Sequence, residues 1–259
     1  MPRQHLVRFP DEGHPPFRPA QARTAALLGP GGLNSLAQKK VAVIGLGGVG
    51  SWTAEFLARS GVGELHLFDP DVIELSNLNR QLQAFPDLVG QSKAMALAER
   101  LDSLGDGIIV PHPVFMDDRM FESLLVPLAP DFILEAIDHV TAKCQILNEA
   151  VWRGIPIISC LGAASRLDPT LVRISDLSEV IRCPLGSDLR RILRRKYGFP
   201  ATGSMGIPAV FSLEKPWDSA GLDDVNGSLA PVTAAFAAAA AAAVIRTLAL
   251  PACANGKKT

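Results

Sequence analysis

The stretch KKVAVIGLGGVGSWTAEFLARSG, residues 39–61, decides the fold of this chain. It begins with a short apolar run, passes four glycines at Gly45, Gly47, Gly48 and Gly50, and continues with helical spacing. A strand, a glycine-rich turn and a helix in this order open a nucleotide-binding βαβ unit. The glycines let the backbone approach phosphate, and the N-terminus of the helix offers free N–H groups. The stretch therefore predicts a nucleotide site, and it fits NAD and ATP equally.

Strand-like and helix-like segments alternate after this turn. The apolar runs predict strands at 40–45, 64–69, 108–112, 131–135 and 156–160, with helices at 49–60, 88–104, 117–125 and 140–153. Strands that alternate with amphipathic helices form right-handed βαβ units. The predicted fold class is therefore α/β, a doubly wound, mostly parallel, Rossmann-like sheet with its ligand site at the carboxyl ends of the strands.

The two ends of the chain carry weaker signals. A short helix is predicted within 24–38, broken around 29–32, and an alanine-rich helix at 230–251. In the last third, TLVRISDLS and PAVFSLEKP predict short strands, and GSDLRRILRRKYG predicts a basic helix. The sequence thus predicts a modified C-terminal third attached to a regular nucleotide-binding core.

Length and charge narrow the class of protein. A chain of 259 residues is long enough for one large domain with a substantial core. We expect a loosely packed arm at 1–22 and a single domain at 23–259, with a nucleotide half at 39–160 and a substrate-facing part at 161–259. The formal net charge of −1 gives no global attraction to nucleic acid or membrane, so such binding needs a local patch.

The cysteines exclude a zinc ribbon and a paired redox site. Cys144, Cys160, Cys183 and Cys253 contain no C-x-x-C pair, so the sequence predicts no zinc. Four scattered thiols in a chain of this length are typical of a reduced, cytoplasmic protein.

The alanine-rich segment is too weakly apolar for a convincing membrane span. Alanine is a strong helix former but a weak hydrophobe, and Arg246 interrupts the segment. We expect a helix that packs closely against a neighbour, without insertion in a membrane.

Polar residues at successive strand ends favour ATP over a dinucleotide. Asp69 ends the second strand, where a carboxylate accepts from ribose hydroxyls. Asn77 and Arg80 follow in DPDVIELSNLNRQ, and Lys93 begins the next helix. Cations that meet at the strand ends neutralise a triphosphate and its leaving pyrophosphate. Asp138, just past the fourth strand, is placed to hold the Mg²⁺ that accompanies ATP.

Each of these residues also has a structural alternative. Arg80 and Lys93 fit solvated surface charges, and Asp138 fits a helix N-cap. A protein that binds a nucleotide without turnover is a further alternative, although it has less need of cations around the phosphates. An NAD oxidoreductase is disfavoured because no separate catalytic His/Lys pair is evident.

The motifs GLGGVGSW, DPDVIELSNLNRQ, VGQSKA and EAIDHVTAK resemble the adenylating domain of the ThiF/MoeB and ubiquitin-activating superfamily, over about residues 24 to 160. The resemblance implies attack of a substrate carboxylate on the α-phosphate of ATP–Mg²⁺, with release of pyrophosphate. It implies catalytic roles for Arg80, Lys93 and Asp138, the last as the magnesium ligand. The implied nucleotide-binding set is Gly45, Gly47, Gly48, Gly50, Asp69, Asp71, Asn77, Arg80 and Lys93.

The last third is similar to tRNA threonylcarbamoyladenosine dehydratases. The similarity is carried by DPTLVRISDLSEVIRCPLGSDLRRILRRKYG, by GIPAVFSLEKP and by PVTAAF. It implies adenylation of the threonyl carboxylate of a modified adenosine beside the anticodon, followed by ring closure with loss of AMP. The alternative is an enzyme that adenylates the C-terminal glycine of a ubiquitin-like or sulfur-carrier protein. Members of that group usually carry two C-x-x-C pairs, which are absent here, and Cys183 is expected to be structural.

A tRNA substrate needs positive charge on the protein. The predicted basic helix places Arg190, Arg191, Arg194 and Arg195 at adjacent positions on its surface. Such a stripe contacts phosphates with salt-sensitive affinity, and its alternative is a solvated face. The sequence thus marks these four arginines as candidate tRNA contacts.

The family resemblance also implies a homodimer, and a sulfur-relay protein as a further partner. Family members carry an N-terminal arginine that reaches the ATP of the partner subunit. Ala26 occupies that position here, and Arg23, one helical turn earlier, is the candidate substitute. Ala209 replaces another usual residue, a cysteine.

Overall fold

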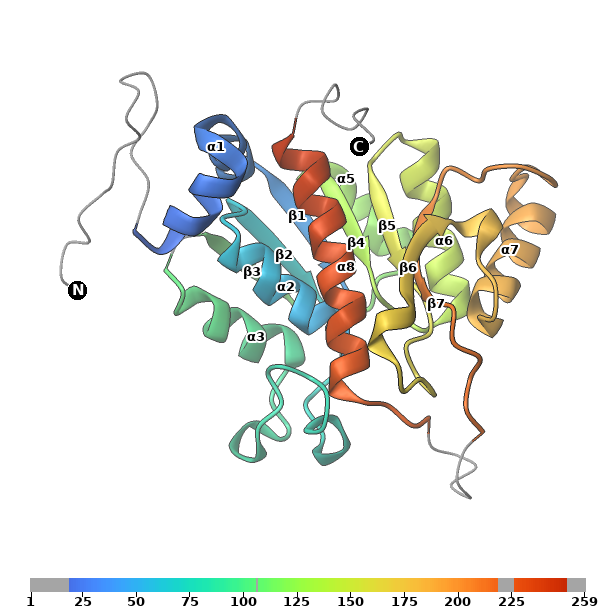
Figure 1. Ribbon diagram of the computed structural model, residues 1–259, viewed down its shortest axis with the longest axis horizontal. Coiled ribbons are helices and arrows are strands. Elements are labelled where there is room, and N and C mark those ends of the chain that lie inside the picture. The colour runs from blue at the N-terminus through green and yellow to red at the C-terminus, as the bar shows by residue number, and fades with distance from the viewer. Residues whose placement is uncertain (1–18, 106, 219–225, 251–259) are drawn as a thin grey trace.

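A computed structural model describes residues 19–105, 107–218 and 226–250. Most of the predicted arm at 1–22 and Cys253 lie outside these ranges. The described chain is built around one sheet of seven strands in the order β3-β2-β1-β4-β5-β7-β6. Six strands are parallel, and β6 pairs antiparallel to β7 at one edge. The predicted fold class is confirmed (Figure 1).

The predicted strands of the nucleotide half are all present, within one residue of their expected bounds. They are β1 (Lys40–Ile44), β2 (Glu64–Phe68), β3 (Ile108–His112), β4 (Phe132–Glu135) and β5 (Ile157–Cys160). The C-terminal part adds β6 (Val172–Asp176) and β7 (Pro208–Ser212). The central strands are mostly apolar because both faces of a parallel sheet are covered.

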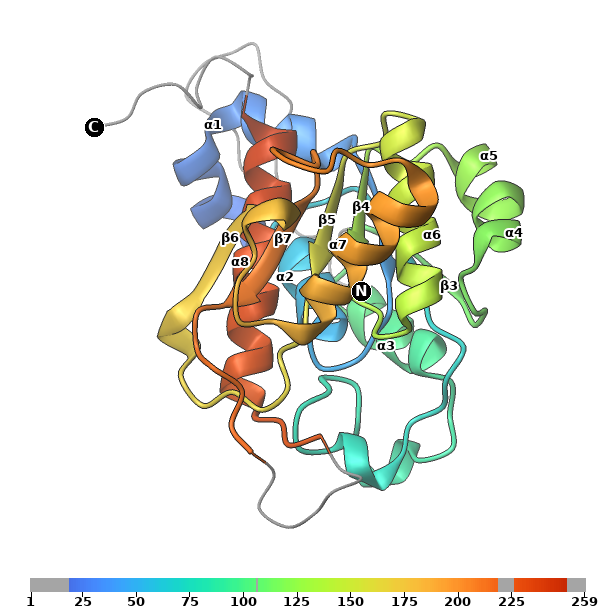
Figure 2. The same cartoon turned by 90° about the vertical axis from the view of Figure 1, so that its right-hand side faces the viewer.

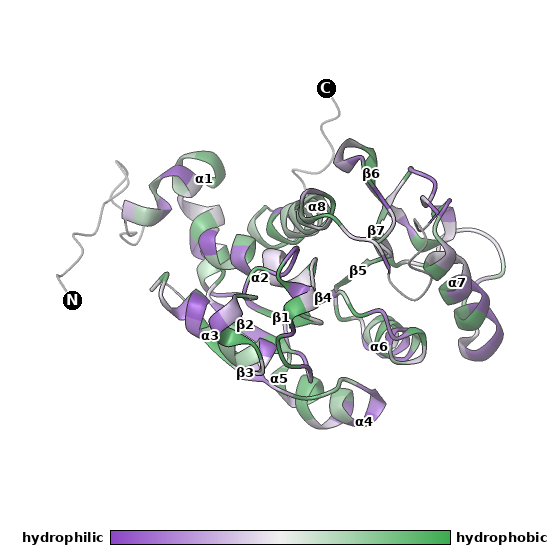
Figure 3. Ribbon diagram, turned by 90° about the horizontal axis from the view of Figure 1, so that it is seen from below, coloured by the Kyte–Doolittle hydropathy of each residue, from purple (hydrophilic) through white to green (hydrophobic). Residues whose placement is uncertain are grey.

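Helices cover the two faces of the sheet (Figures 2 and 3). One face carries α1 (Ala22–Ala37), α2 (Gly50–Arg59), α3 (Lys93–Asp102) and α8 (Ala230–Ala249). The other carries α6 (Val140–Trp152), α7 (Pro184–Tyr197) and a distorted helical run of α4 (Asp118–Met120), η4 (Phe121–Leu125) and α5 (Val126–Leu128). Each face of the sheet packs against its helices in a separate hydrophobic core, and alternate residues of β1 point into the two cores. Val41 and Val43 lie in the core on the first face, and Ala42 and Ile44 lie in the core on the second.

One expectation about the helices needs correction, and another is confirmed. The helix expected at 88–104 begins only at Lys93, because Gly90 has φ +90° and Ser92 caps the helix by accepting from the Met95 N–H. A short turn, η3 (Pro86–Leu88), precedes it. The expected break in the first helix is confirmed, since Gly29 leaves helical geometry immediately before Pro30.

The alanine-rich helix α8 packs along the sheet. Among the described residues it is the one helix long and apolar enough to cross a membrane. Val232, Phe236, Ala240 and Val244 form one fully buried stripe of it, packed in the core shared with α1 and α2. Its small side chains allow this close approach, as the sequence predicted.

Candidate functional site

The glycine turn after β1 is sterically closed on one side. A Cβ on Gly45, where φ is +87°, would lie 2.8 Å from Ile137 Cγ2. A Cβ on Gly50 would lie 1.8 Å from the Gly45 carbonyl oxygen. At Gly47 the added Cβ would meet no atom closer than Gln81 Nε2 at 4.0 Å. Two glycines are therefore needed for the turn itself, and Gly47 leaves open space toward a ligand.

The remaining glycine of the turn, Gly48, lies against two segments that are distant in sequence. A Cβ on Gly48 would lie 3.1 Å from Thr233 Cγ2 and 3.2 Å from Arg80 Cγ. Arg80 comes from the loop after β2, and Thr233 from the first turn of α8. The sequence identified Arg80 as a site residue. Thr233 belongs to the PVTAAF segment that carries part of the family resemblance, but the sequence did not place it at the glycine turn.

Asp69 links the glycine turn to the loop after β2. One carboxylate oxygen accepts from the Leu46 N–H at 2.7 Å, and the other accepts from the Asp71 N–H at 2.9 Å. Burial raises the pKa of Asp69, and these two hydrogen bonds oppose the rise. The predicted ribose acid therefore lies at the carboxyl edge of the sheet, beside the turn.

Lys93 is a buried cation with an acidic partner. Its Nζ lies 2.8 Å from Asp71 Oδ2, and its backbone N–H donates to the Asp71 carbonyl at 3.0 Å. The lysine side chain is 9% exposed, whereas that of Asp71 is 63% exposed. The pair holds the ammonium at the first residue of α3, facing the loop that the sequence assigned to the nucleotide.

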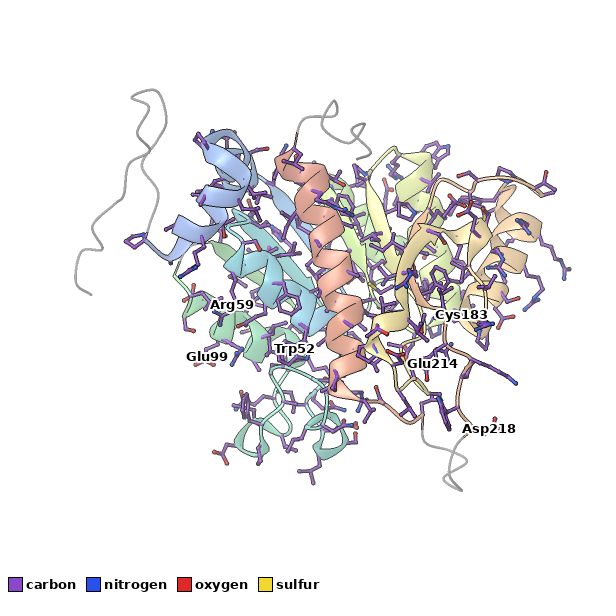
Figure 4. The ribbon with its side chains drawn as sticks, in the orientation of Figure 1. Trp52, Arg59, Glu99, Cys183, Glu214 and Asp218 are labelled. Atoms are coloured by element: carbon purple, nitrogen blue, oxygen red, sulfur yellow. The ribbon has the colours of Figure 1, made fainter. Side chains whose placement is uncertain are left out.

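The loop after β2 fixes Asn77 and Arg80 through its own backbone. Asn77 is buried, and its side chain accepts from the Glu74 N–H at 3.2 Å. Arg80 Nη1 donates to the Ser76 carbonyl at 2.8 Å. Trp52, on α2, donates through Nε1 to the Arg80 carbonyl at 3.1 Å, and Figure 4 shows it next to this loop. These contacts set the guanidinium stem over Gly48.

Two buried glutamines in the same loop were not identified from the sequence. Gln83 donates to the Leu46 carbonyl at 2.9 Å, which ties the loop to the glycine turn. The side-chain oxygens of Gln81 and Gln83 are buried without a hydrogen-bond partner among the described residues. Unpartnered buried amide oxygens are rare, so these two are acceptors available to a ligand or to water at the turn.

A buried ion pair supports the loop that carries Asp138. Glu135, at the end of β4, and Lys143, on α6, are both fully buried and joined by an ion pair. The Glu135 carboxylate accepts from the Ile137 N–H at 2.8 Å, and Lys143 Nζ donates to the Ile137 carbonyl at 3.0 Å. Both polar groups of Ile137 are thus held by the pair, next to an exposed Asp138. The sequence identified Asp138 and missed the pair beneath it.

His139, and not Asp138, caps the following helix. The His139 ring nitrogen Nδ1 accepts from the Ala142 N–H at 3.2 Å. The capping alternative for Asp138 is therefore wrong, and its carboxylate is left at the carboxyl edge. Among residues 19–105, 107–218 and 226–250, no group of three His, Cys, Asp or Glu side chains is arranged to hold a metal ion.

The four arginines of the basic helix do not form a uniform stripe. Arg190 turns toward the protein, where Nη1 donates to the carbonyls of Leu177 and Val180 at 3.1 and 2.7 Å. Arg191 pairs with Asp188 at 2.8 Å, and Arg194 donates to the Pro200 carbonyl at 3.0 Å. Arg195 is exposed. One of the four candidate tRNA contacts is thus engaged in holding α7 to the chain before it.

The described cysteines are buried. Burial raises the pKa of Cys144 to about 11 and that of Cys160 to about 12. Cys183 caps α7, its Sγ accepting from the Gly186 N–H at 3.4 Å. This contact is structural, as the sequence led us to expect.

Arg23 and Ala26 are exposed on α1. Gln21, two residues before Arg23, packs against Gly61, which follows the end of α2 that lies away from the glycine turn. Figure 1 shows α1 at the end of the molecule away from the loop after β2. Within one chain, Arg23 is therefore remote from the candidate site. The prediction that it serves the site of a second copy stays a prediction.

Comparison with known proteins places the sequence in a family and identifies particular relatives. The ThiF family model matches residues 20–258. The tRNA threonylcarbamoyladenosine dehydratase of Bacillus subtilis is 35% identical over 196 residues, which cover 75% of each chain. The corresponding Escherichia coli enzyme is 34% identical over 195 residues, covering 74% of this chain and 72% of that one.

Solved structures give the same result. The E. coli tRNA N6-threonylcarbamoyladenosine dehydratase in complex with ATP has a TM-score of 0.83 and 31% sequence identity, covering 88% of this chain and 93% of that chain. E. coli MccB in complex with ATP is 20% identical with a TM-score of 0.60, which shows a shared fold alone. The resemblance inferred from the sequence motifs is confirmed.

Proposed function

This chain belongs to the ThiF family, and from that premise we propose that it is an ATP-dependent tRNA threonylcarbamoyladenosine dehydratase. The observation that carries the proposal is the meeting of Lys93, Arg80 and Asp138 with the glycine turn at one edge of the sheet. A fold alone does not imply a function, but a site of this composition is suited to adenylation. The identity of 34–35% with named dehydratases over about three quarters of the chain supports the same substrate.

The chain's own groups suit the binding of ATP. The open side of Gly47 and the N-terminus of α2 receive phosphate oxygens. Asp69 accepts hydrogen bonds from the ribose hydroxyls, and the side chains of Arg80 and Lys93 neutralise the negative charge of the phosphates. Asp71 holds Lys93 in place before the nucleotide arrives.

Asp138 fits a magnesium ion that arrives with the nucleotide. Mg²⁺ keeps several waters and takes one or two protein carboxylates together with the phosphates of its substrate, so no preformed cage is needed. Asp138 is exposed at the strand ends, which suits such a role. When bound, the ion neutralises charge that develops on the phosphates.

The reaction then proceeds in two steps. An oxygen of the threonyl carboxylate attacks the α-phosphorus of ATP, and the bond from this phosphorus to the oxygen that bridges the α- and β-phosphates breaks. Pyrophosphate leaves, and Arg80 and Lys93 stabilise the negative charge that it gains. A nitrogen of the same side group next attacks the activated carbonyl carbon, loses its proton and expels AMP, which closes the ring. The net change in the nucleoside is loss of one water. No enzyme nucleophile is required, in agreement with the burial of the three cysteines that the structure describes.

Further features of the proposal concern assembly and location. We place the enzyme in the cytoplasm as a homodimer in which Arg23 of each chain approaches the ATP of the other, with a sulfur-relay protein as a further partner. The end of the molecule that carries the basic helix α7 is proposed to face the tRNA.

Mass analysis of nucleosides tests the proposal directly. Threonylcarbamoyl-modified tRNA is incubated with the protein, ATP and Mg²⁺, then digested, with a reaction lacking ATP as control. Loss of one water from the modified adenosine, only with ATP, is expected. An unchanged nucleoside, from a protein that still binds ATP, contradicts the proposal and favours adenylation of a Gly-Gly-tailed carrier protein.

A further inference from the structure

A second feature lies on the same edge of the sheet as the glycine turn. It is an open hollow of about 700 Å³, lined by Arg182, Cys183, Pro184, Ser187, Arg190, Lys215 and Pro216. Ligand sites in proteins commonly measure roughly 300–1,000 Å³. We name this feature the α7 hollow, because α7 begins in its wall.

The topology places the α7 hollow at the carboxyl ends of the strands. Lys215 and Pro216 follow the end of β7, which runs parallel to β5 and hence to β1. Arg182 lies at the same edge of the sheet, since its Nη1 donates to the carbonyl of Leu213, the residue after β7, at 2.7 Å. Figure 4 shows Cys183 and Glu214 on the side of the molecule that carries Trp52 and the nucleotide loop. A long substrate with one end at the glycine turn is thus able to reach the hollow along this edge.

The hollow collects positive charge from three segments. Arg182 precedes α7, Arg190 lies on α7, and Lys215 follows β7. Among the described residues, none of these three cations has a carboxylate within ion-pairing distance. The two arginines donate to backbone carbonyls through one nitrogen each, and within the part of the chain that the structure describes their other N–H groups have no partner.

The neighbouring acid is occupied elsewhere. The Glu214 carboxylate accepts from the N–H groups of Leu167 and Asp168 at 3.0 and 2.9 Å, and from Trp217 Nε1 at 2.7 Å. It therefore folds back on the chain and does not pair with Lys215, its neighbour in sequence. Backbone N–H groups satisfy the acid and leave the cation unpaired.

Arg166 adds a buried positive charge behind the hollow. Its residue is 2% exposed, its Nη2 donates to the Arg182 carbonyl at 2.7 Å, and its Nε is buried without a partner among the described residues. The first turn of α7 contributes the positive end of a 14-residue helix to the same place. The Glu214 carboxylate lies close enough to Arg166 for their opposite charges to interact, so it balances part of the Arg166 charge. The net positive charge of the hollow therefore comes mainly from Arg182, Arg190 and Lys215.

We propose that the α7 hollow binds a backbone phosphate of the tRNA substrate, and that it does so in place of a uniform stripe along α7. This inference rests on the proposed function and adds the location of the RNA contact. Unpaired arginines beside a helix N-terminus suit a phosphate group, which accepts several N–H bonds at once. Each phosphate neutralised releases counterions, so its contribution appears in the salt dependence of binding.

The test compares three double variants in the full-length protein. Arg182→Gln/Lys215→Gln removes two charges from the hollow, and Arg191→Gln/Arg195→Gln removes two from the outer face of α7. Arg119→Gln/Arg246→Gln, on α4 and α8, is the matched control for net charge, since both residues are exposed and outside the hollow. Binding of threonylcarbamoyl-modified tRNA is measured by fluorescence anisotropy from about 50 to 200 mM KCl.

We expect the hollow variant to bind tRNA at least about tenfold more weakly, with a salt slope lower by about 0.7–0.9 for each phosphate that the variant no longer neutralises. The control is expected to change binding less than about twofold, as distant charges are screened at these salt concentrations. Unchanged binding by the hollow variant overturns the proposal, as does an equal loss of affinity in the control. A loss of affinity confined to the α7-face variant overturns it in favour of the stripe.

Two further measurements separate this inference from the proposed function. ATP affinity and the urea midpoint show whether each variant is folded and binds nucleotide. If wild-type protein binds tRNA through the hollow but does not dehydrate the modified adenosine, the proposed function fails and the hollow stands. If the hollow variant binds normally while wild-type protein dehydrates its substrate, the hollow fails and the function stands. Wild-type protein that binds a Gly-Gly-tailed protein and no tRNA overturns both.

Discussion

The two halves of the carboxyl edge use their charged residues differently. Around the glycine turn, buried lysines have acidic partners: Lys93 pairs with Asp71, and Lys143 pairs with Glu135. Around the α7 hollow, Glu214 accepts from backbone N–H groups and from Trp217, and among the described residues Arg182, Arg190 and Lys215 have no carboxylate partner. A protein of net charge −1 thus has a positively charged site because some of its basic side chains lack acidic partners, and not because basic residues are in excess.

The difference follows from burial. A fully buried lysine needs a carboxylate, because an unpaired charge in the core is strongly unfavourable. An exposed lysine gains little from an ion pair, so the hollow loses little stability by leaving its cations unpaired. The first half therefore uses charge to fix a loop, whereas the second half keeps charge available for a ligand.

The largest effect is expected at the buried pair. Lys143→Met leaves Glu135 as an unpaired buried carboxylate and releases the Ile137 carbonyl, so we expect unfolding to become easier by about 3–5 kcal/mol. Urea denaturation measures this change. The double variant Glu135→Gln/Lys143→Met removes both charges and is expected to recover a large part of the stability. A single variant within about 1 kcal/mol of wild type would contradict the structural importance of the pair.

The next largest effect is expected at Asp138, in the half of the carboxyl edge around the glycine turn, and it is an effect on the adenylation reaction. Asp138→Asn keeps the size of the side chain and removes its charge, and we expect ATP–pyrophosphate exchange to fall by about 10²-fold or more. Arg80→Ala is expected to have an effect of similar size. Glu99→Gln, an exposed acid on α3, serves as the control and is expected to be silent. Exchange near the wild-type rate in Asp138→Asn would remove this carboxylate from the catalytic site.

The contrast also marks what the sequence was able to predict. The glycine turn, Asp69 and Lys93 were predictable because they lie at fixed offsets from one strand–turn–helix unit. Thr233 and the α7 hollow depend on segments that are distant in sequence and meet only in the folded chain. Lys143 is close to Glu135 in sequence, but the burial that makes their ion pair important is a property of the folded chain. The stripe expected on α7 failed at Arg190 because helical spacing gives neighbours on the helix surface, but not which face the tertiary packing covers.

A smaller effect is expected at Asp176, an acid on the α7 side of the sheet. Its carboxylate accepts from the N–H groups of Ser178, Met205 and Gly206 at 2.9, 2.9 and 2.8 Å. Burial opposes ionisation, but these bonds and one from Ser204 outweigh it and hold the pKa of Asp176 below its usual range. We expect Asp176→Ala to lower the free energy of unfolding by about 1–2 kcal/mol at neutral pH.

The sign of the pH dependence follows from that lowered pKa. The folded carboxyl titrates below the unfolded one, so its stabilisation is present above about pH 4 and declines as pH falls toward the folded pKa. The gap in stability between wild type and Asp176→Ala, measured by urea denaturation, should therefore be full at pH 7 and narrower at about pH 3. A gap that widens in acid would show that the carboxylate is not the stabilising form.

The smallest effect on stability is expected at Lys215, the counterpart of Lys143 in the α7 hollow. Lys215 is exposed, and its ammonium has no hydrogen bond or ion pair among the described residues. The substitution Lys215→Gln therefore removes no polar interaction with these residues. We expect its free energy of unfolding to stay within about 0.5 kcal/mol of wild type in the urea experiment used for Lys143→Met. A destabilisation comparable to that of Lys143→Met would mean that Lys215 has a structural partner, and the hollow would then have no unpaired ammonium to offer a phosphate.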